Sequence, residues 1–148
     1  MKLSEHFALG ELTRSSTALR HEVDNIPNDG QIVNLRRLCD HILEPVRQHF
    51  GIPFSPSSGF RCLEVNRLVG SKDTSQHREG RAADFEVPTV PNHVLASWIY
   101  HNCEFDQVIL EFYDPKDPQS GWVHASVKAE GNRREFLSFD GKNYKRMA

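Results

Sequence analysis

The chain has 148 residues, of which 38% are hydrophobic and 26% charged, and its formal net charge at pH 7 is −2. This length and composition are typical of one globular domain and exclude a disordered or fibrous protein, so we expect residues 1–148 to form a single domain. The small net charge provides no positive field that would attract nucleic acid or an anionic membrane surface. We therefore expect neither as a partner.

The first third of the chain predicts short amino-terminal elements followed by one long helix. Residues 1–27 carry short polar and helix-starting signals, which predict a docking arm with a short helical turn over residues 13–19. Apolar residues that recur every three or four positions predict an amphipathic helix over residues 28–50. Pro45 lies inside this helix and predicts a kink or break near residues 41–44, because proline removes a backbone donor and clashes with the preceding turn.

The middle of the chain alternates between extended and helical patterns. Residues 54–61 predict a short strand that runs into a turn, and residues 62–69 predict a helix. A polar loop over residues 70–79 follows. Residues 81–87 then alternate in the manner of a strand.

The last part of the chain predicts one helix and three strands. The helix covers residues 92–103, with Asn92 as its cap. Two strands, over residues 107–113 and 122–127, are joined by a turn-rich segment, and an edge strand follows over residues 134–139. Helices around several short strands indicate an α+β fold.

The cysteines and the amino terminus indicate a cytoplasmic site of synthesis. Cys39, Cys62 and Cys103 are widely spaced and odd in number, which predicts reduced thiols and argues against a disulfide framework or a thiolate zinc cage. The first seven residues lack the apolar core of a signal peptide, and no apolar run is long enough to cross a membrane.

One stretch of sequence predicts a metal site. The residues from Ser75 to Asp84 follow the pattern S-x-H-x-x-G-x-A-x-D. His77 leaves a polar loop and Asp84 lies on the strand that follows, so both side chains can converge on one ion if Gly80 allows a sharp turn. His124, on a later strand, supplies a third ligand if the two strands lie side by side.

Two imidazoles and one carboxylate suit a zinc ion. Three protein ligands leave a fourth position open for water, which is typical of a catalytic rather than a structural zinc site. Zinc lowers the pKa of coordinated water from about 15.7 to about 7 and polarises carbonyl groups. The pattern therefore favours hydrolysis of an amide bond.

Three separated motifs in this order resemble a known family. They are Ser58-Gly59-Phe60-Arg61 with Asn66, the stretch from Ser75 to Asp84, and Trp122-Val123-His124. Together they resemble the zinc D-Ala-D-Ala carboxypeptidases and their peptidoglycan endopeptidase relatives, which include phage endolysins, and the hedgehog signalling domain shares the fold. The resemblance covers about residues 3–127. It implies an α+β fold in which a small antiparallel sheet carries the zinc site and helices flank the sheet.

The resemblance also implies roles for individual residues. His77, Asp84 and His124 would hold one zinc ion, and the substrate would be a stem peptide of peptidoglycan. Arg61 would bind and polarise the carbonyl or carboxylate of the substrate, with Ser75 beside it as a hydrogen-bond donor. We expect Trp122 to form a wall of the pocket.

The chain departs from the family pattern at the catalytic base. Many members carry an acidic residue three positions before the last histidine ligand, and this chain has Gly121 there. Glu111, an ionisable residue among aliphatic neighbours on the preceding strand, is our candidate for the base. Asp114 and Asp117 are the alternatives.

Several functional alternatives remain open at this stage. The peptidase would act as a carboxypeptidase or an endopeptidase, and a non-catalytic zinc module or a virion structural protein with the same fold are the competing hypotheses. Because no signal peptide is evident, we expect the protein to reach the cell wall after lysis, by non-classical export or by phage delivery. We expect it to be a monomer.

Overall fold

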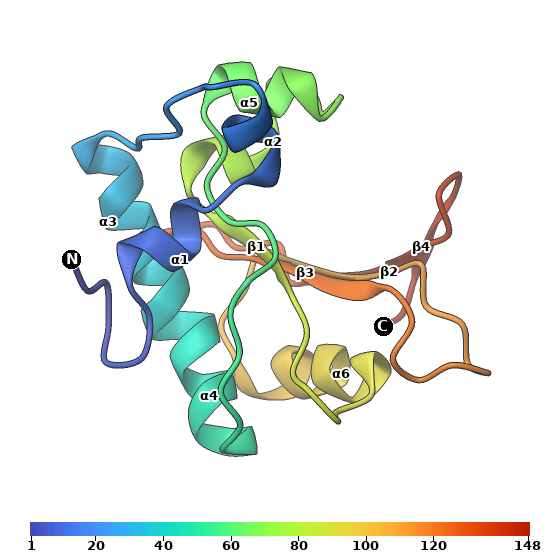
Figure 1. The fold of residues 1–148 in the computed structure, drawn as a ribbon. Helices are drawn as coiled ribbons and strands as arrows, with labels where there is room; N and C mark the ends of the chain where they lie inside the picture. Colours follow the sequence, from blue (N-terminus) through green and yellow to red (C-terminus); the bar gives the residue numbers. More distant parts are fainter.

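The computed structural model describes residues 1–148 as an α+β fold, in which helices flank one five-stranded sheet (Figure 1). The strands, in the spatial order β1-β3-β2-β4-β5, are β1 (Ala82–Phe85), β3 (Trp122–Ser126), β2 (Gln107–Glu111), β4 (Glu135–Phe139) and β5 (Tyr144–Arg146). The predicted α+β class is confirmed. The sheet is mixed rather than wholly antiparallel, because the link over residues 127–134 passes the beginning of β2, at Gln107, and places β4 parallel to β2.

The predicted long helix is continuous but changes its winding ahead of the proline. It consists of α3 (Asp29–Leu38), a π-helical turn η1 (Cys39–Leu43) and α4 (Glu44–Phe50). Within the turn, the Glu44 N–H donates to the carbonyl of Cys39, five residues back. A π-turn accommodates Pro45, which has no N–H to donate, so the expected break is a local widening of the helix.

The remaining helices are short, except for α6. They are α1 (Leu9–Thr13), α2 (Ser16–Arg20), α5 (Leu63–Leu68), the 3₁₀ turn η2 (Gln76–Glu79) and α6 (Asn92–Asn102). The predicted turn over residues 13–19 corresponds to α2. The amino-terminal arm docks as expected, since Leu3, Phe7 and Leu12 are buried in the hydrophobic core. None of the helices combines the length and the apolar character that crossing a membrane requires.

The two faces of the sheet differ in character. Helix α6 packs beneath the sheet (Figure 1), against the face that presents Val108, Leu110, Val123 and Ala125 to the core. Because side chains alternate along a strand, the opposite face carries Asp84 on β1, Ile109 and Glu111 on β2 and His124 on β3. The predicted site residues that belong to the sheet therefore lie on the face that α6 leaves open.

The predicted strand over residues 54–61 is wrong. The segment forms only an isolated bridge between Ser58 and Asp84, because Pro53 and Pro56 provide no N–H for a ladder of hydrogen bonds. That one bridge holds the segment against the strand that carries Asp84. The Asp84 N–H donates to the Ser58 carbonyl over 2.8 Å, so this segment lies directly beside β1.

Two further expectations for the carboxyl-terminal half are corrected. Strand β4 is not an edge strand, because β5 pairs with it, and the three exposed residues of β5 carry no pattern that predicts a strand. Asn92 does not cap α6, whose N-cap is Pro91. Instead, the Asn92 amide donates to the carbonyls of Ser120 and Gly121 and fixes the loop between β2 and β3.

Candidate metal centre

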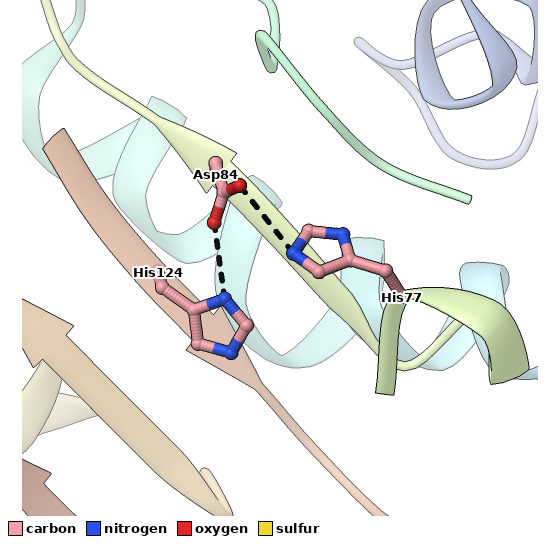
Figure 2. Close-up of side chains that lie close together, drawn as sticks. All are labelled: His77, Asp84 and His124. Carbon is pink, nitrogen blue, oxygen red and sulfur yellow. Dashed lines mark hydrogen bonds and ion pairs between the residues drawn. The ribbon is translucent and has the colours of Figure 1, made fainter. Parts of the chain in front are cut away.

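Three side chains from three separate elements meet on the open face of the sheet (Figure 2). His77 comes from η2, Asp84 from β1 and His124 from β3, where it lies directly opposite Asp84 in the antiparallel register. Nε2 of His77 lies 3.4 Å from Oδ2 of Asp84, and Nδ1 of His124 lies 3.0 Å from Oδ1. The three ligand atoms all lie within 4.8 Å of one another.

These separations fit one zinc ion. Tetrahedral zinc with bonds of 2.0–2.1 Å places its ligand atoms about 3.3 Å apart, close to both contacts of the Asp84 carboxylate. The tautomer of His77 is also set correctly. Its Nδ1 lies 2.8 Å from the Gly59 carbonyl oxygen, which can only accept, so Nδ1 carries the proton and Nε2 presents its lone pair toward Asp84.

The charge states of the cluster suit a cation as well. Burial lowers the pKa of His77 and keeps its imidazole neutral, as a metal ligand must be. Burial of the Asp84 carboxyl opposes its ionisation, but the adjacent His77 and His124 outweigh that effect and hold its pKa below the usual range. The centre therefore presents the lone pair of His77 and the negative charge of Asp84, with the His124 ring beside that carboxylate.

Two glycines allow this convergence. Gly80 has a φ of +75°, and a Cβ there would lie 2.7 Å from the carbonyl oxygen of Gln31. The sharp turn predicted at Gly80 is thus confirmed. A Cβ on Gly59 would overlap the carbonyl of Leu12, and without this close approach the Gly59 carbonyl could not face His77.

The three side chains line a polar cavity of about 640 Å³, and the structure brings the other predicted site residues to the same cavity. Those residues are Arg61, Ser75, Glu111 and Trp122. The alternative bases do not reach it. Asp114 and Asp117 form an isolated backbone bridge in the exposed loop between β2 and β3.

Glu111 carries the carboxylate of this cavity that does not belong to the metal cluster. It lies opposite Trp122 in the sheet, and its Oε2 accepts a hydrogen bond of 2.9 Å from the Trp122 indole. Burial raises the pKa of Glu111, and the negative charge of Asp84 raises it further. The carboxylate is therefore held in a fixed orientation with an increased affinity for a proton.

The peptidase M15 family model matches residues 5–125, which is most of the chain. The chain belongs to the peptidase M15 family. This family consists of zinc-dependent metallopeptidases, so the protein is a metallopeptidase and the resemblance seen in the sequence is confirmed. A search of curated proteins finds no match.

The structure explains why this M15 peptidase lacks an acidic residue at position 121. Gly121 has a φ of +67°, and a Cβ there would overlap the backbone oxygen of Glu111. No side chain fits at this position, because the turn into β3 passes too close to the end of β2. Two carboxylates line the cavity, and that of Glu111 is the one outside the metal cluster.

Replacing Gly121 by alanine is expected to lower the free energy of unfolding by more than about 2 kcal/mol, since the left-handed backbone alone costs roughly 1–2 kcal/mol for a residue with a Cβ. Urea denaturation measures the effect. Gly131 is the matched control, with a φ of +72° and no atom within 4 Å of its Cβ position. Equal losses in the two variants would show that the overlap at Gly121 has no effect.

Arg61 brings a guanidinium with unused donors to the cavity of this M15 peptidase. Its guanidinium makes one hydrogen bond, from Nη1 to Oγ of Ser71 over 3.3 Å, and its Nε is buried without an acceptor. Burial lowers the pKa of Arg61 and the charges of Asp84 and Glu111 raise it, but a guanidinium remains protonated in proteins. The guanidinium N–H groups of Arg61 that make no hydrogen bond are therefore unused donors. Ser75 accepts the His77 N–H, which leaves its hydroxyl proton free.

Sequence reasoning missed part of the cavity wall. Lys72, Gln76 and Gln107 line the cavity, as do Arg133 and Tyr144 near the carboxyl terminus. The last two residues follow position 125, where the family match ends. No motif or spacing marks them in the sequence, because their position depends on β4 pairing with β2 and on β5 pairing with β4.

Proposed function

We propose that this metallopeptidase hydrolyses an amide bond in peptidoglycan stem peptides, as a carboxypeptidase or an endopeptidase, with one zinc ion held by His77, Asp84 and His124. The observation that carries this proposal is a single cavity. It contains three converging metal-ligand side chains, a separate carboxylate on Glu111 and an unpaired guanidinium on Arg61.

The metal would supply the electrophilic part of the chemistry. Zinc at this position would lower the pKa of a coordinated water molecule and polarise the carbonyl of the bond to be cut. The Gly59 carbonyl fixes the ring of His77 with Nε2 toward the site, and the sheet register places His124 opposite Asp84, so the three side chains suit such an ion.

Glu111 would move the protons. Its carboxylate accepts a proton from the attacking water and passes it to the amine that leaves, which is the usual task of a general base and acid in amide hydrolysis. The hydrogen bond from Trp122 occupies only Oε2, so Oε1 is free to receive the proton. The raised pKa of Glu111 improves its ability to hold that proton until the amine departs.

Arg61 and Ser75 would bind the substrate. A guanidinium with several unused donors is well suited to hold a carbonyl oxygen or a terminal carboxylate, and hydrogen bonds from charged donors are the stronger ones. As negative charge develops on the carbonyl oxygen, the same donors stabilise it.

The choice of peptidoglycan rests on the resemblance of the three motifs to D-Ala-D-Ala carboxypeptidases and peptidoglycan endopeptidases. The polarity of the cavity supports this choice. Its lining is mostly polar and contains charged groups of both signs, as expected for a short peptide that offers carbonyls and carboxylates rather than large apolar side chains.

Incubation of the purified chain with isolated bacterial cell walls tests the proposal. We expect new amino groups to be released, the release to stop when a zinc chelator is added, and activity to return when zinc is restored. Mass spectrometry of the soluble fragments identifies the bond that is cut. Walls that yield no chelator-sensitive release would instead support a non-catalytic zinc module or a structural protein.

A further inference from the structure

The wall of the cavity that the family match does not cover carries a fixed positive charge. Arg133 lies in the link before β4, outside residues 5–125, yet it lines the same cavity as His77 and Glu111. Its place in the cavity is therefore a property of this chain's carboxyl-terminal segment rather than of the motifs shared with the family.

Asp106 holds this arginine in position. The Asp106 side chain is fully buried and accepts hydrogen bonds from Nη2 of Arg133 at 2.7 Å, from its Nε at 3.2 Å and from its backbone N–H at 2.8 Å. Asp106 also accepts a bond of 3.0 Å from the side chain of Gln76, the residue that precedes His77. The same carboxylate thus fixes Arg133 relative to the loop that carries a metal ligand.

The outer end of the guanidinium remains available. Nη1 of Arg133 makes no hydrogen bond, and its nearest acidic oxygen, on Glu135, is 4.0 Å away and accepts a 2.6 Å hydrogen bond from Gln107. Lys72 also lines the cavity, is exposed, and has no carboxylate within ion-pair distance. Nε and Nη2 of Arg133 are paired with Asp106, so the donors of these two residues that lack a hydrogen-bond partner within the protein are Nη1 of Arg133 and the Lys72 ammonium.

The charge of the whole cavity points to the kind of ligand. Three cationic side chains line it, on Arg61, Lys72 and Arg133. Three carboxylates balance them, those of Asp84 and Glu111 in the lining and that of the buried Asp106, which pairs with Arg133. A bound divalent ion adds two further positive charges. Because the side-chain charges balance, the bound ion makes the cavity positive in a chain whose net charge is −2.

We propose that Arg133 and Lys72 form a subsite for a carboxylate that the substrate carries in addition to the group bound by Arg61, so that the preferred substrate is an acidic peptide. This inference rests on the proposed peptidase function and specifies its substrate class. Arg133 and Lys72 are specificity residues in this scheme, and Asp106 is the positioning residue that holds the arginine.

Binding to a zinc-loaded Glu111→Gln variant, which retains the cavity, tests the subsite without hydrolysis. The probes are fluorescein-labelled peptides that end in D-Ala-D-Ala, with one glutamate moved over the three preceding positions, and each peptide has a glutamine counterpart. At one position, we expect the glutamate peptide to bind about 10-fold more tightly by fluorescence anisotropy, as one charged hydrogen bond predicts. Adding Arg133→Gln or Lys72→Gln should reduce this ratio to about 3-fold or less.

Arg14→Gln is the matched control, because it removes the same charge from an exposed residue that lines no part of the cavity. It should leave the ratio unchanged. If Arg133→Gln unfolds the chain by removing the partner of Asp106, Lys72→Gln still tests the subsite, because the Lys72 side chain makes no hydrogen bond or ion pair within the protein. Equal affinities for every glutamate and glutamine pair, or a ratio that neither substitution changes, would overturn the subsite.

The two proposals can fail separately. A wild-type chain that cleaves no wall or peptide, while the glutamate preference persists in the binding assay, contradicts the peptidase function alone. A chain that cleaves peptides with no preference for a glutamate at any position contradicts the acidic subsite alone.

Discussion

Replacing Glu111 by glutamine is expected to lower kcat/KM for peptide hydrolysis by about 10²- to 10⁴-fold, the usual contribution of a general acid and base. Glutamine has nearly the same shape, and its side-chain oxygen can still accept the Trp122 indole N–H. What it cannot do is accept a proton from water and return it. Zinc content should stay at the wild-type level, because Glu111 is not one of the three converging ligand side chains.

Asp114→Asn and Asp117→Asn are the controls for this prediction. Both residues are acidic, belong to the adjoining loop and are exposed, and neither lines the cavity. We expect each variant to keep wild-type kcat/KM. If Glu111→Gln remained fully active while Asp114→Asn or Asp117→Asn lost activity, the base would lie in the loop, and the loop would have to close over the cavity during the reaction.

The metal cluster could be predicted from sequence because its geometry is local or follows from strand alternation. His77 and Asp84 are seven residues apart, and Gly80 between them marks the turn that lets both side chains face the same way. His124 required only that its strand lie beside β1, which the register of the two strands shows. The motif therefore contained most of the information needed to place three side chains.

The remainder of the site depends on contacts between distant segments that leave no local pattern. The overlap that excludes a side chain at Gly121 involves the backbone of Glu111, so it becomes visible only when β2 and β3 are paired. Arg133 reaches the cavity because β4 lies parallel to β2. A short link such as residues 127–134 would instead favour an antiparallel hairpin between β3 and β4. The predicted strand around Ser58 is absent for a related reason. Its apolar residues pack in the core, but its prolines prevent regular pairing.

Replacing Asp84 by asparagine is expected to weaken zinc binding by at least about 100-fold, since loss of an outer partner of a metal ligand alone costs 10- to 100-fold. Asparagine removes the only negative charge of the cluster and turns an NH₂ group toward one of the two histidines. The fold should persist. The hydrogen bonds that hold residue 84 to Ser57 and Ser58 are made by its backbone N–H and carbonyl, which the substitution does not change.

Competition with a chromogenic zinc chelator measures this loss, and far-UV circular dichroism verifies that the variant is folded. Glu86→Gln is the matched control, because Glu86 is an exposed acid two residues further along the chain. Its one side-chain hydrogen bond is accepted from the Asn92 amide, and a glutamine oxygen can accept it as well. We expect this control to bind zinc as the wild type does. An Asp84→Asn variant that held zinc with undiminished affinity would show that the ion binds elsewhere. His77 and His124 would then not be zinc ligands, and the orientation that Gly59 gives to His77 would have no role in metal binding.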